Sequence, residues 1–427
     1  MPAWPEHVFW WHLYPLGFVG APIRDGEGPH AEPVHRLERL EPWLDHVIDL
    51  GLNGLLLGPV FASETHGYDT VDHFRIDPRL GDDGDFDRLV SAARARGIRI
   101  LLDGVFNHVG RAHPAFREQT EDGPHLFRGR WVDGRFEADV FEGHEALVAL
   151  DHSSPATADL VVEVMCHWLE RGIDGWRLDA AYAVPAGFWA EVLPRVRERF
   201  PEAWFVGEVI HGDGPSIVRE STMDSLTQYE LWQGIWHGIA DGNLFELSHA
   251  IERHDELLAT YAPQTFVGNH DVTRIASAVG AELVPHALAV LFTVAGTPSV
   301  YAGDEFGWAA VKEERLGGDD AVRPEFPARP AEMKPDERIL RAHQALIALR
   351  RRKPWLWRAH TDVVEVANTA LALRTAVGDD AVVVALNIGD DTVSLPIADG
   401  RTVVAGEGAP SDGRIELGPR GWAVLEA

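Results

Sequence analysis

Short apolar runs of strand type alternate with longer stretches in which apolar residues recur at helical spacing. This alternation is the pattern of repeated βαβ units, which build a parallel sheet. Residues 85–96 are a helical stretch, in which we expect Asp85 to cap the first turn and Gly97 to end the helix. Residues 337–352 are another. The expected strands are residues 8–14, 54–57, 98–105, 175–179, 204–208, 225–229, 265–269 and 299–301.

Two parts of the chain depart from this alternation. Residues 109–151 are rich in Gly, His, Asp and aromatic residues without a clear period, so we expect a long excursion after the third strand. Irregular segments of such length in compact domains are more often functional than accidental. From about Thr361 onward the helical signal ends, and strand-like runs are separated by Gly-rich turns. This ending predicts a small antiparallel β domain.

Eight strand-like runs with helices between them predict an α/β fold, a (β/α)8 or TIM barrel. The barrel would comprise residues 1–108 and 152–358, with residues 109–151 as an insertion. Residues 359–427 would form a C-terminal β-sandwich domain. Residues 317–335 are expected to form a mobile loop.

Composition narrows the class of protein. The chain has 427 residues, of which 45% are hydrophobic, enough for a large buried core. Acidic residues outnumber basic ones by 67 to 38, so a nucleic acid would be repelled. The single cysteine, Cys166, excludes an intrachain disulfide and is expected to be a buried thiol. Because we find no leader pattern and no apolar run of membrane-spanning length, we expect a cytoplasmic protein without a membrane partner.

Polar side chains gather at the ends of the expected strands, which is where a barrel of this type keeps its chemistry. Three of these side chains are carboxylates that would meet in one mouth. Hydrolysis or transfer of a glycoside needs two carboxyl groups, one beside the sugar carbon and one to protonate the departing oxygen. The segments are Asp103-Gly-Val-Phe-Asn107-His108, Gly175-Trp-Arg177-Leu-Asp179, Phe205-Val-Gly-Glu208 and Phe266-Val-Gly-Asn269-His270-Asp271.

In order and content these four segments resemble the conserved regions of the α-amylase family of glycoside hydrolases and transglycosylases. Residues 51–61 and 296–307 resemble the second and eighth strands of that family. The resemblance implies that Asp179 is the nucleophile, which forms a covalent glycosyl intermediate, and that Glu208 is the general acid and later the base. Asp271 would be the third carboxylate, which binds hydroxyls of the distorted sugar. Retention of the α configuration follows from this assignment.

Other residues are expected to bind or position the substrate. By the resemblance, His108 and His270 are the pair of imidazoles around the reacting sugar, and Tyr68 is its stacking platform. Arg177 lies two residues from Asp179 on the same strand face, where its charge would keep that carboxylate ionised. We interpret Asp103 as the residue that orients Arg177. Most of the fifteen tryptophans are expected to pack in the core, but Trp232, Trp236 and Trp308 are candidates to line sugar subsites.

No cofactor is expected for this chemistry. Many members of the family hold a structural calcium between the barrel and the excursion, and Asn107 matches one of its ligands. Ala149 stands where an Asp ligand would fall, so one oxygen ligand is missing and the calcium site is not expected. Asn107 alone remains a candidate metal ligand. We interpret the run Asp82-Asp-Gly-Asp85 as a turn before a helix.

The expected function is therefore a retaining hydrolase that cleaves α-1,4-glucosidic bonds in maltooligosaccharides or small α-glucosides. After Asp179 the chain reads Ala180-Ala-Tyr-Ala and lacks the Lys-His pair of many starch-degrading relatives, so bulk starch is not expected. The alternative is an α-glucosidase or transglycosylase that differs in acceptor or linkage. A more remote alternative is a non-catalytic carbohydrate-binding member, against which the presence of Asp179 and Glu208 argues. Linkage preference, chain length, endo or exo action and oligomeric state stay open.

Overall fold

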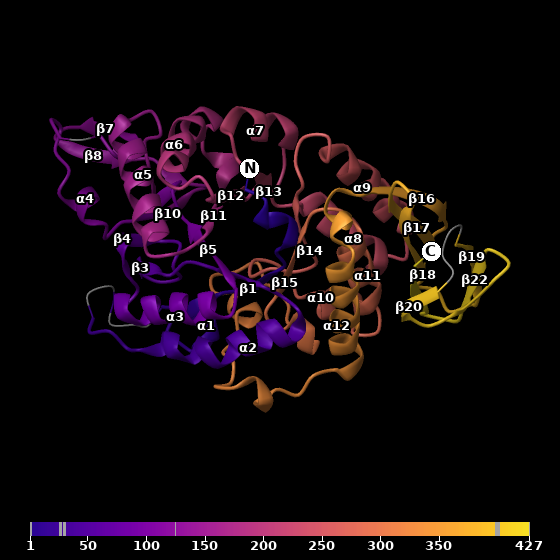
Figure 1. The fold of residues 1–427 in the computed structure, drawn as a ribbon. Coiled ribbons are helices and arrows are strands. Elements are labelled where there is room, and N and C mark those ends of the chain that lie inside the picture. The colour runs from indigo at the N-terminus through magenta and orange to yellow at the C-terminus, as the bar shows by residue number, and fades with distance from the viewer. Residues whose placement is uncertain (1, 25–27, 29–30, 124, 398–401, 427) are drawn as a thin grey trace.

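Eight parallel strands form one sheet that closes on itself into a barrel (Figure 1). The computed structural model describes residues 2–24, 28, 31–123, 125–397 and 402–426. A parallel bridge between Thr227 and Gln264 joins the two strands at opposite ends of the sheet, which closes the ring. The predicted fold class is therefore confirmed. The strands are β1 (Trp10–Leu13), β2 (Gly54–Leu57), β5 (Arg99–Gly104), β11 (Gly175–Leu178), β12 (Trp204–Gly207), β13 (Ser225–Leu226), β14 (Gln264–Phe266) and β15 (Thr297–Tyr301).

The inward-facing side chains of these strands change from apolar to polar along the barrel axis. Trp10 and Trp204 stack inside the barrel with ring centroids 6.0 Å apart, and with Leu101 they belong to one small buried cluster. Because side chains alternate across a strand, the inward positions two residues further on are His12 on β1 and Asp103 on β5. The outward positions pack on the helices. The barrel interior is therefore apolar at the level of Trp10 and Trp204 and polar nearer the carboxyl ends of the strands.

Helices surround the barrel on its outer side (Figure 1). The helix predicted for residues 337–352 is found with those bounds, but the start predicted for residues 85–96 is wrong. Asp82 caps that helix and Asp85 is its third residue, because their side chains and backbone amides bond reciprocally. The helices are α1 (Pro15–Phe18), α2 (Glu41–Leu50), α3 (Asp83–Ala95), α4 (Pro114–Arg117), α5 (Pro155–Glu170), α6 (Ala186–Arg199), α7 (Gly214–Ser221), α8 (Tyr229–Ala240), α9 (Leu244–Leu257), α10 (Ile275–Val279), α11 (Val284–Thr293) and α12 (Glu337–Arg352).

The excursion after β5 contains short antiparallel strands rather than irregular chain. Strands β6 (His108–Gly110) and β9 (Val140–Phe141) flank β10 (His144–Ala149), and β7 (Gly129–Val132) pairs with β8 (Arg135–Ala138). Val109, Phe127, Val148 and Leu150 form a small core of their own. Most positions of β7 and β8 are at least partly exposed, which explains why these strands show no apolar alternation. The two-stranded sheet of β3 (Phe61–Ser63) and β4 (Thr70–Ile76) lies between β2 and α3 in the chain.

The end of the chain forms two antiparallel sheets, as predicted. Strand β18 alternates between two cores: Val382 and Val384 belong to the main core, and Val383 and Ala385 to a second core between the sheets. The five-stranded sheet therefore has both faces covered. Its strands are β16 (His360–Val366), β17 (Ala370–Val377), β18 (Asp380–Asn387), β20 (Thr402–Gly406) and β23 (Trp422–Glu426), and the smaller sheet has β19 (Val393–Pro396), β21 (Ala409–Ser411) and β22 (Arg414–Leu417).

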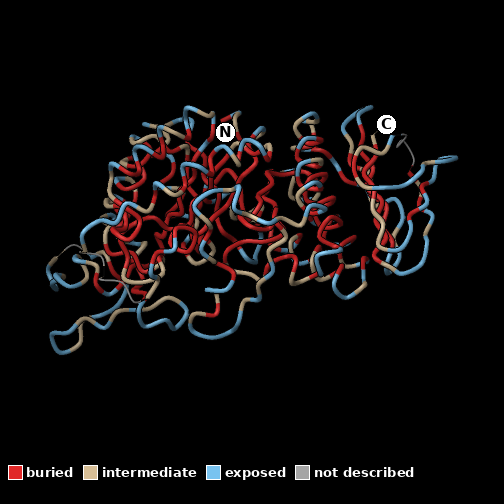
Figure 2. The backbone as a smooth tube through the Cα atoms, turned by 90° about the horizontal axis from the view of Figure 1, so that it is seen from below, coloured by how far each residue is buried: buried red, intermediate tan, exposed pale blue. Residues whose placement is uncertain are grey.

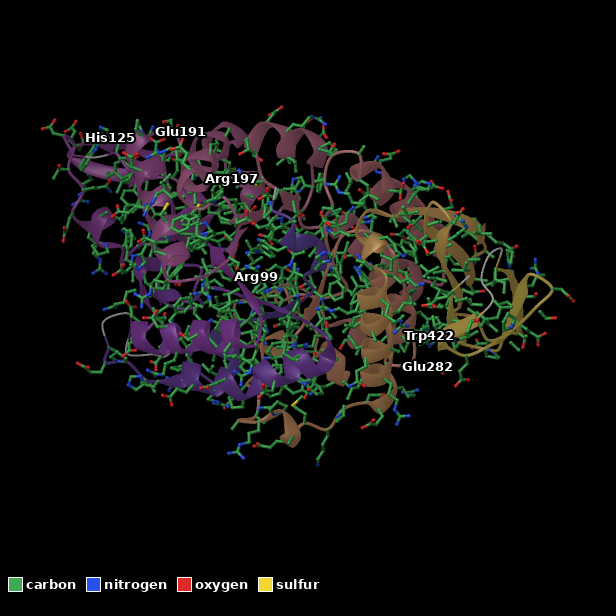
Figure 3. The ribbon with its side chains drawn as sticks, in the orientation of Figure 1. Arg99, His125, Glu191, Arg197, Glu282 and Trp422 are labelled. Carbon is green, nitrogen blue, oxygen red and sulfur yellow. The ribbon has the colours of Figure 1, made fainter. Side chains whose placement is uncertain are left out.

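Helices α11 and α12 lie between the barrel and the C-terminal sheets (Figure 1). All ten residues of α11 are buried. Figure 2 shows buried segments both in the barrel and in the C-terminal part. Glu282, just before α11, and Trp422 of β23 line one cavity at this junction (Figure 3). Cys166 is a free, buried thiol, as expected. Among the residues described here, no helix combines the length and the apolar content that crossing a bilayer requires.

Candidate active site

Arg177 occupies the centre of the barrel mouth and binds three carboxylates. Its Nη1 donates to both oxygens of Asp103 at 2.7 and 2.8 Å and to Oδ1 of Asp179 at 2.9 Å. Its Nη2 lies 2.6 Å from Oε1 of Glu208. All four residues are buried and stand at the ends of β5, β11 and β12. The parallel register places Arg177 beside Asp103, as the interpretation of Asp103 required.

This cluster carries more negative than positive charge in a buried place. Burial raises the pKa of Asp103 to about 6, although the Arg177 guanidinium opposes the rise. Burial also raises the pKa of Asp179 above its usual range, and Glu208 and Asp103 add to the rise while Arg177 opposes it. Arg177 thus favours the ionised form of Asp179, but the effect of burial on its pKa is larger. Such a site stabilises positive charge that develops on a bound molecule.

Both oxygens of Glu208 have further hydrogen-bond donors besides Arg177. The backbone amide of Ala180 donates to Oε2 at 3.0 Å, and the hydroxyl of Tyr229 donates to Oε1 at 3.0 Å. Ala180 has a φ of 44°, a left-handed conformation that costs energy for a residue other than glycine. Asn269 in turn donates to the Tyr229 hydroxyl at 3.0 Å. Tyr229 was missed as a site residue, although it ends the sixth expected strand.

Asp271 lies apart from the Arg177 ion pairs and has its own cation. Nη2 of Arg323 is 2.6 Å from Oδ1 of Asp271, and Nε2 of His270 is 3.0 Å from Oδ2. The Nε of Arg323 also donates to the backbone carbonyl of His270 at 2.9 Å. The Asp271 side chain is 34% exposed, so it faces solvent more than the other two carboxylates do. The structure therefore brings Asp179 and Glu208 onto one guanidinium and Asp271 onto another.

Arg323 was not among the residues predicted for the site. It belongs to the segment expected to be a mobile loop, yet Val322, Arg323 and Phe326 are buried, and Phe326 stacks on Phe18 with centroids 4.3 Å apart. The guanidinium of Arg323 also lies over the ring of Tyr14, 4.7 Å from its centroid. No local pattern marks this arginine, because the segment around it is polar and Gly-rich. Its role arises from packing against residues near the start of the chain.

Tyr68 and His270 lie together beside Asp103. The Tyr68 hydroxyl donates to Oδ2 of Asp103 at 3.1 Å and contacts Nε2 of His270. Tyr14 and Tyr68 both lie nearly parallel to the His270 ring, with centroids 6.2 and 5.7 Å away. His12 meets the same ring edge-on at 4.9 Å. Of the two imidazoles expected around the sugar, His270 thus belongs to this group of contacts.

His108 has a different environment. Its ring stacks on Phe141 of the excursion with centroids 4.7 Å apart, and its Nδ1 lies 3.1 Å from the amide nitrogen of Asn107. Burial lowers the pKa of His108 to about 3, so the ring is neutral at physiological pH. Ala149 pairs with His108 across strands β6 and β10. Ala149, which has no side-chain oxygen, therefore lies beside the segment that contains Asn107, and the absence of a calcium site stays a prediction.

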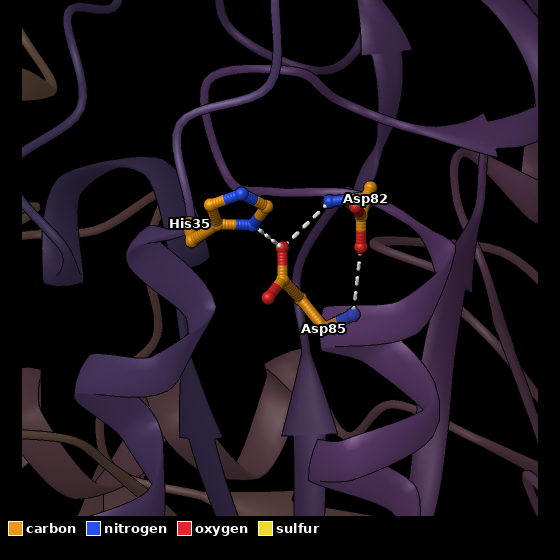
Figure 4. Close-up of side chains that lie close together, drawn as sticks. All are labelled: His35, Asp82 and Asp85. Carbon is orange, nitrogen blue, oxygen red and sulfur yellow. Dashed lines mark hydrogen bonds and ion pairs between the residues drawn. The ribbon is translucent and has the colours of Figure 1, made fainter.

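His35, Asp82 and Asp85 form the one group of potential metal ligands within the described ranges (Figure 4). Their ligand atoms lie within 4.8 Å of one another. Asp85 accepts from Nδ1 of His35 at 2.6 Å and from the Asp82 amide at 2.8 Å, and it also pairs with Arg88. Asp82 accepts from the Asp85 amide at 2.9 Å. These carboxylates serve as the cap of α3, as the turn interpretation predicted.

Comparison with known proteins adds independent findings. The family model for the α-amylase catalytic domain matches residues 37–130 and 127–363. Neopullulanase 2 of Thermoactinomyces vulgaris is 32% identical over 93% of this chain and 72% of its own length. A cyclomaltodextrinase of a Bacillus species is 32% identical over 72% of this chain, which spans only 60% of that relative. The solved cyclic α-maltosyl-(1→6)-maltose hydrolase of Arthrobacter globiformis, in complex with that sugar, superposes with a TM-score of 0.83 at 26% identity, covering 100% of this chain and 99% of its own.

Proposed function

Because the chain belongs to the α-amylase family, we propose that it hydrolyses α-1,4-glucosidic bonds in maltooligosaccharides or small α-glucosides. One observation carries the proposal: a single guanidinium, Arg177, holds Asp179 and Glu208 together at the barrel mouth. Two carboxyl groups bound to one guanidinium lie close together. Retaining glycosidases need such closeness, since their carboxyl groups are about 5 Å apart.

In the proposed mechanism Asp179 attacks the anomeric carbon and forms a covalent glycosyl intermediate. Glu208 protonates the departing glycosidic oxygen and then removes a proton from the water that releases the sugar. The Tyr229 hydroxyl and the Ala180 amide hold the Glu208 carboxyl in place for both transfers. Side chains and water suffice for these steps, so the proposal includes no cofactor.

The remaining charged residues support the transition state in this proposal. The half-exposed Asp271 is placed to accept hydrogen bonds from sugar hydroxyls, while His270 and Arg323 orient it. The excess negative charge of Asp103, Asp179 and Glu208 over Arg177 stabilises the positive charge of the oxocarbenium-like transition state.

Two relatives favour short or cyclic substrates. The Arthrobacter neighbour hydrolyses a cyclic maltosyl-maltose, and the Bacillus relative is named for cyclomaltodextrins. We therefore include cyclic maltooligosaccharides among the proposed substrates. A transglycosylase would use the same intermediate with a sugar as the acceptor. The cytoplasmic location expected from the sequence remains a prediction, which cell fractionation tests.

The test is replacement of Asp179 by Asn with product analysis on malto- and isomalto-oligosaccharides, sucrose, trehalose and cyclodextrins. We expect the wild type to release glucose or maltose from the α-1,4-linked substrates and the variant to lose about a thousandfold or more in kcat. Asp159→Asn, at an exposed position on α5, is the matched control. Comparable turnover by Asp179→Asn contradicts the proposed nucleophile. Longer products after addition of sugar acceptors would favour the transglycosylase.

A further inference from the structure

A cavity of about 360 Å³ opens beside Asp271 and is not used by the mechanism above. Trp232 and Trp236 of α8 form one wall. They are four residues apart, so both indoles project from the same face of the helix, and their ring centroids are 5.8 Å apart. Lys312 and Glu314, from the loop after β15, also line the cavity. The cavity thus combines flat apolar faces with charged hydrogen-bonding groups.

Trp232 also lines a second cavity, of about 730 Å³, next to the general acid. Val209, Ile210 and His211, the three residues that follow Glu208, line that cavity as well. The part of a substrate that departs is attached to the oxygen that Glu208 protonates. Because Trp232 lines both cavities, the cavity beside Asp271 borders the region next to Glu208, and we place it on the leaving-group side of the scissile bond.

Lys312 lines the cavity beside Asp271 and is held there by its loop. Its backbone amide donates to Oγ1 of Thr273 at 3.1 Å, which ties the loop to the segment after Asp271. Within the described part of the chain, its ammonium group has no carboxylate within ion-pair distance. Lys312 and Asp271 line the same cavity, which places the lysine beside the third carboxylate. Burial lowers the pKa of His270, and the charges of Arg323, Arg177 and Lys312 lower it further.

We propose that Trp232, Trp236 and Lys312 form a subsite for the glucopyranose unit on the leaving-group side of the scissile bond. The proposal rests on the proposed function. The apolar face of a pyranose ring covers an indole face, and the ring hydroxyls accept hydrogen bonds from the Lys312 ammonium group. The same unit is the acceptor when a sugar instead of water resolves the intermediate.

The test compares two substrates with the same donor sugar, α-maltosyl fluoride and maltotriose. Fluoride is too small to occupy the subsite, whereas the departing glucose of maltotriose would fill it. We expect Trp232→Ala and Lys312→Met each to lower kcat/KM for maltotriose about tenfold and to change the value for the fluoride less than twofold. Trp355→Ala, which truncates another partly buried tryptophan, is the matched control and should change neither value.

Two variants are needed because Trp232 contacts Tyr229, which holds the general acid, with centroids 5.7 Å apart. Lys312 is not in that contact, so agreement between the variants separates sugar binding from disturbance of Glu208. Equal losses on both substrates, or a loss in Trp232→Ala alone, overturn the subsite. A wild type that cleaves the fluoride and no oligosaccharide instead contradicts the proposed function, and the subsite with it.

Discussion

Arg177 forms ion pairs with Asp103, Asp179 and Glu208, and no other cation in the described part of the chain pairs with these three carboxylates. We therefore expect Arg177 to stabilise the fold as well as the charges of the site. We expect Arg177→Met to lower the free energy of unfolding at pH 7 by about 3–5 kcal/mol, because buried carboxylates lose their counterion. The loss should shrink as the pH falls towards 5, since protonated carboxyl groups no longer need the cation. Urea unfolding of the wild type and the variant at pH 7 and at pH 5 measures this loss in the free energy of unfolding.

Arg219→Met is a suitable control for that measurement, because Arg219 donates to Ser216 on the exposed surface of α7. Its effect should stay within about 0.5 kcal/mol. If Arg177→Met lowers the free energy of unfolding by less than about 1 kcal/mol, the buried carboxylates do not need Arg177 as their counterion, and the prediction is wrong.

Tyr229 is a positioning residue for Glu208, to which its hydroxyl donates at 3.0 Å. We expect Tyr229→Phe to lower kcat for maltooligosaccharides about tenfold or more, because a hydrogen bond to a charged group contributes about 1.5–3 kcal/mol. Hydrolysis of a glycosyl fluoride should change much less, since fluoride departs without help from the acid. Equal losses on the two substrates would assign Tyr229 a purely structural role.

At the scale of elements, helix α11 joins the barrel to the C-terminal sheet through His286. Its Nε2 donates to the backbone carbonyls of Asn387 and Gly421, both at 3.2 Å, and burial lowers its pKa to about 4. The folded protein therefore binds fewer protons than the unfolded chain between pH 6.5 and 4. The contribution of His286 to stability is present above pH 6.5 and is lost as the pH falls through 4, by about 3 kcal/mol in all.

The variant His286→Gln tests whether His286 makes the protein less stable as the pH falls. Glutamine keeps an N–H donor but does not titrate, so the free energy of unfolding should fall less between pH 7 and pH 5 than it does in the wild type. His249→Gln, at an exposed position on α9, is the control. An identical pH dependence in wild type and His286→Gln would show that His286 binds the same number of protons in the folded and unfolded states, which contradicts the lowered pKa.

Elements with regular burial were predictable, and elements with mixed burial were not. Strands β2 and β12 are buried at every position and are flanked by turns, which makes apolar runs such as Gly54–Leu57 visible in the sequence. Strand β8 alternates between exposed and half-buried positions, and its sequence Arg135-Phe-Glu-Ala138 contains no apolar run. The hairpin of β7 and β8 therefore could not be predicted from the sequence, and its backbone pairing identifies it in the structure.

At the scale of the whole molecule, the barrel and the C-terminal sheets share one core. Leu346 and Ile347 of α12 belong to the same buried cluster as Val384 and Leu386 of β18. We expect one cooperative thermal transition in calorimetry. We expect a chain ending at residue 358 to aggregate, because the largely apolar face of α11 that surrounds His286 would be exposed. Two well-separated transitions would contradict this view. The domain boundaries predicted at residues 109, 152 and 359 remain predictions.

The sequence alone determined the barrel and the side chains at its strand ends, because both depend on short-range periodicity: Asp103, Arg177, Asp179 and Glu208 follow apolar runs directly. Only the tertiary structure decided which charges meet. Arg323 reaches Asp271 across 52 residues of chain, and Trp232 comes to lie beside both Asp271 and the residues after Glu208. Such contacts depend on how separate loops close over the barrel, and no local pattern of apolar and polar positions encodes that closure.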